Sequence, residues 1–253
     1  MRKKIFTLIS MLLMSSLFVG CTKVKEENKT DSHKVQITVS IEPLKEFTEI
    51  IGGDKVQVTT MVPTGAEPHD FEPKTKDLVE LNKSQIFIYN GLNMEEWIDK
   101  VLGTIENKDL VIVDSSNGVN VIEHGESAGE DSHNHGAIDP HIWLSLKECK
   151  IQALNIKNAI VKVDSANSQY YEKNYNKFVE DVDALFNEYK PQFDALINKN
   201  FVTGHAAFGY LCRDFGLSEE SVENLFGEGE ITPQRLKQLV EFSKEHNVKT
   251  MLL

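Results

Sequence analysis

Short β-rich runs alternate with helical stretches along most of this 253-residue chain. Four early runs are predicted to be strands: residues 35–39, 56–62, 85–89 and 110–113. Helical segments such as residues 43–51 and 74–82 separate them. Strands that alternate with helices form parallel sheets, because each crossover helix returns the chain to run in the same direction. The predicted fold class is therefore α/β.

The same alternation resumes near the C-terminus. Its predicted elements are a strand at 200–203, helices at 206–215 and 233–246, and a strand at 249–253. Residues 165–190 contain neither glycine nor proline and carry apolar side chains at helical spacing, which predicts one long, rigid amphipathic helix. We therefore expect an N-terminal α/β lobe (residues 35–164), a linking helix (165–190) and a C-terminal α/β lobe (191–253). Because residues 249–253 resemble the beginning of a buried strand, we expect the chain to be a C-terminally truncated form of a longer protein.

The N-terminus has the layout of a secretory signal peptide, with a basic start followed by an apolar stretch that ends at residue 20. Leu17-Phe18-Val19-Gly20-Cys21 resembles a bacterial lipobox, in which the cysteine is lipidated. Residues 21–34 are polar and predict a flexible tether that begins at Cys21. The folded part is therefore expected outside the cytoplasm, anchored to the bacterial membrane by lipid. The alternative is an uncleaved anchor.

The net charge of −12 argues against a nucleic-acid-binding surface, because such a surface must be basic to displace counterions. Two cysteines besides Cys21 remain, Cys149 and Cys212, and both fall in apolar helical patterns. Buried free thiols are the favoured interpretation, and a disulfide between them is the alternative.

Three histidines lie near predicted strand ends or helix starts. They occur in Glu67-Pro68-His69-Asp70-Phe71, Asp139-Pro140-His141-Ile142-Trp143 and Thr203-Gly204-His205-Ala206-Ala207. A single loop histidine is more often merely exposed. Three imidazoles that converge in the crevice between the lobes, however, leave a fourth position for a carboxylate or water, which suits zinc. No Cys-x-x-Cys or His-Glu-x-x-His motif is present.

These motifs, in this order, resemble those of the ABC-transporter solute-binding lipoproteins that deliver zinc or manganese. The other matching segments are Asn90-Gly91-Leu92, Glu95-Glu96-Trp97 and Tyr171-Glu172-Lys173-Asn174. The resemblance implies that His69, His141 and His205 are metal ligands and that the protein is a monomer. It also implies that a membrane permease and its ATPase are the partners, and that the protein is not an enzyme.

The resemblance further implies a fourth ligand, an Asp or Glu, beyond Leu253. Glu228 or Glu230 is a less favoured substitute. Because His205 makes the site rich in nitrogen, we expect Zn²⁺ rather than Mn²⁺. Two other functions stay open: an extracytoplasmic zinc hydrolase that uses the same histidines, and a surface adhesin in which zinc is structural.

Residues 124–136 form a polar segment without any apolar residue larger than alanine, which predicts a surface loop. His124, His133 and His135 in this loop are predicted to hold additional metal weakly, and the alternative is that they are incidental. Deletion of residues 123–136 should leave the tight site intact and remove only the weaker zinc, because the three motif histidines lie elsewhere. Calorimetric titration of both forms tests this, and loss of the tight site would show that the loop contributes ligands.

Overall fold

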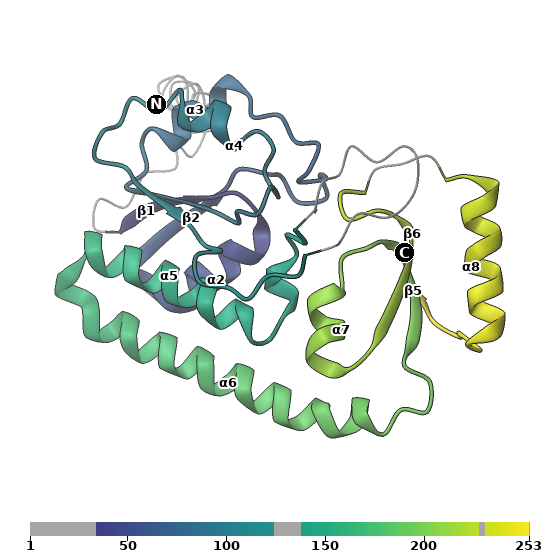
Figure 1. The fold of residues 1–253 in the computed structure, drawn as a ribbon. Helices are drawn as coiled ribbons and strands as arrows, with labels where there is room; N and C mark the ends of the chain where they lie inside the picture. The colour runs from purple at the N-terminus through teal and green to yellow at the C-terminus, as the bar shows by residue number, and fades with distance from the viewer. Residues whose placement is uncertain (1–33, 124–137, 228–230, 253) are drawn as a thin grey trace, which may run out of the picture. The chain divides into compact units, whose positions relative to one another are not determined.

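The structure is a computed structural model that describes residues 34–123, 138–227 and 231–252 (Figure 1). Several features predicted from the sequence lie outside the described residues: the signal peptide, Cys21, nearly all of the tether, His124, His133, His135, Glu228 and Glu230.

Four strands form the first sheet, in the order β2-β1-β3-β4. They are β1 (Val35–Val39), β2 (Val56–Thr60), β3 (Ile86–Tyr89) and β4 (Val111–Asp114). All their pairings are parallel, which confirms the predicted α/β class. Alternation of buried and exposed positions is weak in β1 and β3, where nearly every residue is buried, as expected for central strands covered on both faces.

Helices cover both faces of this sheet, with α2 and α5 on one side and α3 and α4 on the other (Figure 1). Their bounds are α2 (Glu42–Gly52), α3 (Thr75–Leu81), α4 (Ile98–Leu102) and α5 (Glu148–Val163). Three short 3-10 turns accompany them: Gly53–Lys55, Ile142–Leu144 and Ser165–Asn167. Residues 142–144 form one of these turns, and α5 begins after it at Glu148, where the Ser145 side chain accepts the N–H of Glu148.

The long helix α6 spans Ser168–Asp194, close to the predicted range. Its length is about 40 Å at 1.5 Å per residue. The first half buries Tyr171, Phe178 and Val182 against the first sheet's helices, as the predicted apolar stripe requires. The second half differs from the prediction, because Leu185 and Tyr189 are exposed. There the helix contacts the second sheet's helix α7 through aromatic rings, with Phe193 and Phe215 centroids 4.7 Å apart.

A second parallel sheet has the order β6-β5-β7. Its strands are β5 (Asn200–His205), β6 (Ser218–Glu223) and β7 (Met251–Leu252), and its helices are α7 (Gly209–Phe215) and α8 (Pro233–Glu245). The division of the chain at residues 164 and 190 stays a prediction.

The sequence did not predict β6. It placed the end of β5 two residues too early and the start of α7 three residues too early. β6 reads Ser-Glu-Glu-Ser-Val-Glu, which lacks the apolar alternation of a strand. It is an edge strand held by its ladder with β5, in which His205 pairs with Glu223. This pairing extends β5 to His205 and delays the helix to Gly209. Both remaining cysteines are free thiols, Cys149 in α5 and Cys212 in α7, as predicted.

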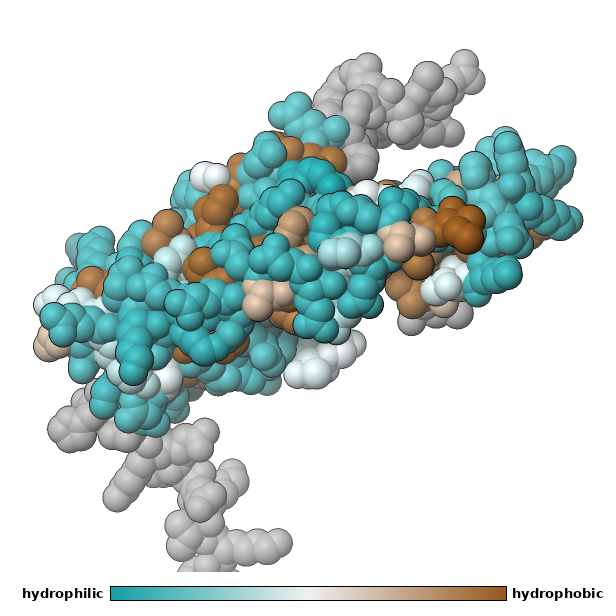
Figure 2. All heavy atoms as spheres, turned by 90° about the horizontal axis from the view of Figure 1, so that it is seen from below, coloured by the Kyte–Doolittle hydropathy of each residue, from teal (hydrophilic) through white to brown (hydrophobic). Residues whose placement is uncertain are grey.

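Polar residues predominate on the face shown in Figure 2, in keeping with the acidic composition. Among residues 34–123, 138–227 and 231–252, no helix combines the length and the apolar run that crossing a membrane requires.

A buried polar network joins the carboxyl ends of strands β1 and β3 of the first sheet. Glu95 is 1% exposed, and its carboxylate accepts hydrogen bonds from the Ser40 hydroxyl and from the backbone N–H groups of Asn90 and Gly91. The Asn90 amide in turn donates to the carbonyl of Pro140 at 2.8 Å. The network therefore anchors the segment that carries His141 to the ends of the strands.

Burial raises the pKa of Glu95 to about 7, and the three hydrogen bonds lower it only in part. In the unfolded chain this carboxyl titrates near 4.5, so the folded protein holds a proton that the unfolded chain releases between these values. The stability contributed by this group is thus present below pH 4.5 and is lost as pH rises through 7.

We predict that Glu95→Gln removes a pH-dependent loss of roughly 3 kcal/mol in the free energy of unfolding between pH 4.5 and 7.5. Chemical denaturation of the metal-free protein at several pH values measures this difference. Glu96→Gln, at the exposed neighbouring position, is the matched control and should follow the wild-type profile. Parallel profiles for the wild type and Glu95→Gln would contradict the raised pKa.

Candidate metal centre

His69 lies in the loop between β2 and α3, directly after Pro68, which restricts the backbone before it. Its backbone N–H donates to the Glu67 carboxylate at 3.4 Å. The ring is 6% exposed and packs edge-on against Phe226, with centroids 5.3 Å apart. Its Nδ1 is buried and has no hydrogen-bond partner among the described residues. Such a nitrogen is available to a ligand.

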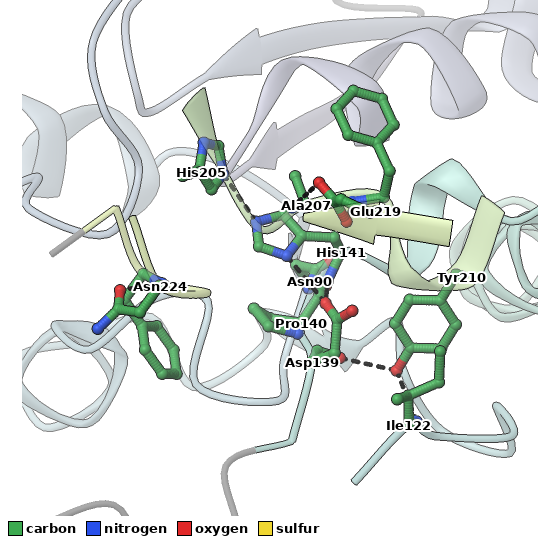
Figure 3. A network of polar contacts seen from close by, with 12 residues as sticks. Asn90, Ile122, Asp139, Pro140, His141, His205, Ala207, Tyr210, Glu219 and Asn224 are labelled. Atoms are coloured by element: carbon green, nitrogen blue, oxygen red, sulfur yellow. Dashed lines mark hydrogen bonds and ion pairs between the residues drawn. The ribbon is translucent and has the colours of Figure 1, made fainter. Parts of the chain in front are cut away.

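His141 follows Pro140 and begins the 3-10 turn before α5. Asp139 Oδ1 accepts hydrogen bonds from both the backbone N–H and the ring Nδ1 of His141, each at 2.9 Å (Figure 3). A hydrogen on Nδ1 leaves the lone pair of Nε2 free. A carboxylate behind a histidine is the usual partner of a metal-binding imidazole, since it fixes the tautomer and the ring orientation.

His205 is the last residue of β5, and its Nε2 lies 3.3 Å from Nε2 of His141 (Figure 3). Two zinc-bound imidazole nitrogens at 2.0–2.1 Å from a tetrahedral ion are about 3.3 Å apart. One ring nitrogen from each of His69, His141 and His205 lies within 4.8 Å of the others. The structure thus brings together the three histidines that the sequence singled out, two from loops of the first sheet and one from the end of β5 in the second.

Burial, together with the neighbouring His141, lowers the pKa of His69 to about 4. Burial and His141 also lower the pKa of His205, while Glu67 raises the pKa of both residues. Imidazoles whose pKa lies below the usual value are neutral near pH 7, the form that binds a metal ion. Both rings are therefore prepared for a cation without first losing a proton.

No Asp or Glu of the described ranges joins the three histidines within the same distance. The sequence analysis assigned no role to three residues whose hydrogen bonds hold the histidine-bearing segments: Asp139, Tyr210 and Glu219. Asp139 was visible two residues before His141, a spacing that lets a side chain accept the histidine N–H. Tyr210 and Glu219 carry no such local signal, because their contacts join distant parts of the chain.

A groove of about 690 Å³ lies elsewhere, between α8 and the second sheet, and none of the three histidines lines it. A single ion held by converging ring nitrogens requires no large cavity. We therefore identify the functional site from the histidine geometry.

Comparisons with known proteins identify the family of this chain. The family model for the periplasmic component A of the zinc-uptake complex, ZnuA, matches residues 37–253. The high-affinity zinc uptake system protein ZnuA of Bacillus subtilis is 33% identical over 248 residues, which cover 95% of this chain and 76% of the relative. The zinc-binding lipoprotein AdcA of Streptococcus pneumoniae is 30% identical over 249 residues, which cover 95% of this chain but 49% of the relative.

Among solved structures, a ZnuA deletion mutant with zinc bound superposes with a TM-score of 0.74 at 33% sequence identity, covering 85% of this chain and 78% of that one. With parallel sheets, a long helix and a family match over most of its length, the chain belongs to the ZnuA family of zinc-uptake binding components.

Proposed function

We propose that this protein captures Zn²⁺ outside the cytoplasm and delivers it to the permease of an ABC transporter, with His69, His141 and His205 as the metal ligands. The observation that carries the proposal is the 3.3 Å separation of the His141 and His205 Nε2 atoms, with Asp139 behind His141. Zinc-coordinating nitrogens are held at this separation. Family membership and the zinc named in the relatives support the same ion.

The ligand set favours zinc over manganese. Three neutral imidazoles follow the order of affinities in which Zn²⁺ exceeds Mn²⁺, whereas manganese sites are richer in oxygen. A fourth position remains for a carboxylate or for water. The same resemblance supports a transport role rather than an enzymatic one.

We propose that Cys21 carries the lipid anchor and that residues 21–34 tether the folded part to the membrane. The signal-type sequence before Cys21 and the lipoprotein named among the relatives support this location. His124, His133 and His135 are proposed as an accessory zinc-holding loop, a role that rests on their sequence alone.

Replacing any one of the three histidines by alanine should weaken zinc binding by at least about 100-fold, more than the loss of an outer partner of a ligand usually costs. Competition against a chromogenic chelator measures the affinity. His246→Ala is the matched control, because His246 is exposed and stacks on Phe242 at the end of α8. Wild-type affinity in all three cluster variants would exclude this site.

Zinc should bind more tightly than manganese in the same competition, because all three ligands found in the described residues are imidazoles. Equal affinities would favour manganese delivery as the role.

Growth of a gene-deletion strain in zinc-depleted medium separates transport from adhesion. Poor growth that the wild-type gene restores and His141→Ala does not is the expected result. A hydrolytic activity that disappears with His205→Ala would instead favour the enzyme alternative.

A further inference from the structure

One face of the short helix α7 is joined by hydrogen bonds to the segment that carries His141. Tyr210, Arg213 and Asp214 share this face, since residues three and four apart on a helix are neighbours. Tyr210 is fully buried, and its hydroxyl donates to the carbonyl of Asp139 at 2.7 Å and accepts the N–H of Ile122 at 3.2 Å (Figure 3).

The next turn of α7 makes ionic contacts to the same region. Arg213 donates to the carbonyl of Asn120 at 2.6 Å and to the Glu148 carboxylate at 2.5 Å. The buried Asp214 carboxylate accepts the Ser145 hydroxyl at 2.6 Å. These partners flank His141 along the chain, Asn120 before it and Ser145 and Glu148 after it. Helix α7 therefore contacts both sides of the segment that carries this histidine.

Helix α7 is also tied to His205. Only residues 206–208 separate the end of β5 from the start of α7. Glu219 of β6 holds this connection, because its carboxylate accepts the N–H of Phe208 at 3.0 Å and that of Ala207 at 3.3 Å. The Thr203 hydroxyl lies 2.6 Å from the same carboxylate. His205 and α7 are thus fixed to one another by a short, bonded turn.

The start of α7 approaches the partner of His141 closely. A Cβ atom at Gly209 would lie 2.7 Å from Asp139 Oδ2, a distance that only glycine avoids without displacement. Helix α7 is therefore connected to the histidine cluster in two ways, through Asp139 to His141 and through residues 206–208 to His205.

We propose that α7 is a positioning clamp that sets the distance between His141 and His205, and that Tyr210 is its central positioning residue. The inference rests on the proposed metal-binding function of these histidines. The two Nε2 atoms already lie 3.3 Å apart, close to the separation that a shared zinc ion requires, so the surrounding structure holds the rings near their metal-binding positions. A site held in place before binding loses less entropy when the ion arrives.

The test compares Tyr210→Phe with Tyr171→Phe in the full chain. Both tyrosines are fully buried, and each variant removes one hydrogen-bonded hydroxyl, but Tyr171 bonds to Asp164 beside α6. Zinc affinity is measured by chelator competition, and the Co²⁺ absorption spectrum reports the coordination geometry. Thermal unfolding of the metal-free variants measures the loss of stability that the two substitutions share.

For Tyr210→Phe we expect zinc affinity to fall by roughly 10-fold or more and the Co²⁺ spectrum to change, as on loss of an outer partner of a ligand. Tyr171→Phe should lose stability but keep the wild-type affinity and spectrum. Wild-type affinity and spectrum in Tyr210→Phe would overturn the clamp, as would equal losses in both variants.

A second variant covers the case in which Tyr210→Phe does not fold. Arg213 is partly exposed, and Arg213→Lys keeps the charge but cannot make both contacts to Asn120 and Glu148. Reduced affinity with an altered Co²⁺ spectrum supports the clamp, and wild-type values overturn it. The clamp can fail while the proposed function holds. In that case the wild type still binds zinc tightly and His141→Ala still loses binding, whereas Tyr210→Phe and Arg213→Lys behave like the wild type.

Discussion

Asp139 accepts hydrogen bonds from both the backbone N–H and the ring of His141. The geometry of the histidine cluster depends on this pair of residues. The carboxylate is completely buried, and its Oδ2 has no hydrogen-bond partner among the described residues. A buried carboxylate with one unpartnered oxygen is costly to the free protein. In the proposed assignment, a dication bound to His141 would offset part of that cost, because its positive charge would attract the carboxylate behind the imidazole. The hydrogen bond that orients His141 would then also favour occupation of the site.

The position of this pair is set by both sheets. In the first sheet, Glu95 and Asn90 hold the carbonyl of Pro140 at the ends of the strands. From the second sheet, Tyr210 holds the carbonyl of Asp139. The backbone on both sides of the Asp139–Pro140 bond is therefore bonded to groups far away in the sequence. Proline alone restricts only its own backbone dihedral angles and those of the preceding residue. The orientation of His141 therefore depends on these long-range hydrogen bonds.

The sequence predicted the features that repeat or lie close together, and it missed those that depend on distant partners. Strands β1 and β3 were recognised because they are short runs of mostly apolar residues, which favour a buried strand. Helix α6 was recognised because its apolar side chains keep helical spacing over many turns. The edge strand β6, which is polar except for Val222, was missed because only its ladder with β5 makes it a strand. The three histidines were identified from their motifs, whereas Tyr210 and Glu219 act through contacts that no local pattern encodes.

The charge around the cluster bears on how an ion enters and leaves. Three neutral imidazoles bind through lone pairs and cancel none of the two positive charges, so these ligands alone leave the bound ion uncompensated. The exposed Glu67, whose charge raises the pKa of both His69 and His205, supplies a negative field at this position. A field from an exposed group attracts a cation but is screened by solvent and salt. In the proposed site, the charge of Glu67 would thus assist the approach of the cation, while the binding affinity would depend on the three imidazole nitrogens and on the fourth ligand. In the proposed assignment, a change in the geometry of the three nitrogens would release the ion with no covalent change in the ligands.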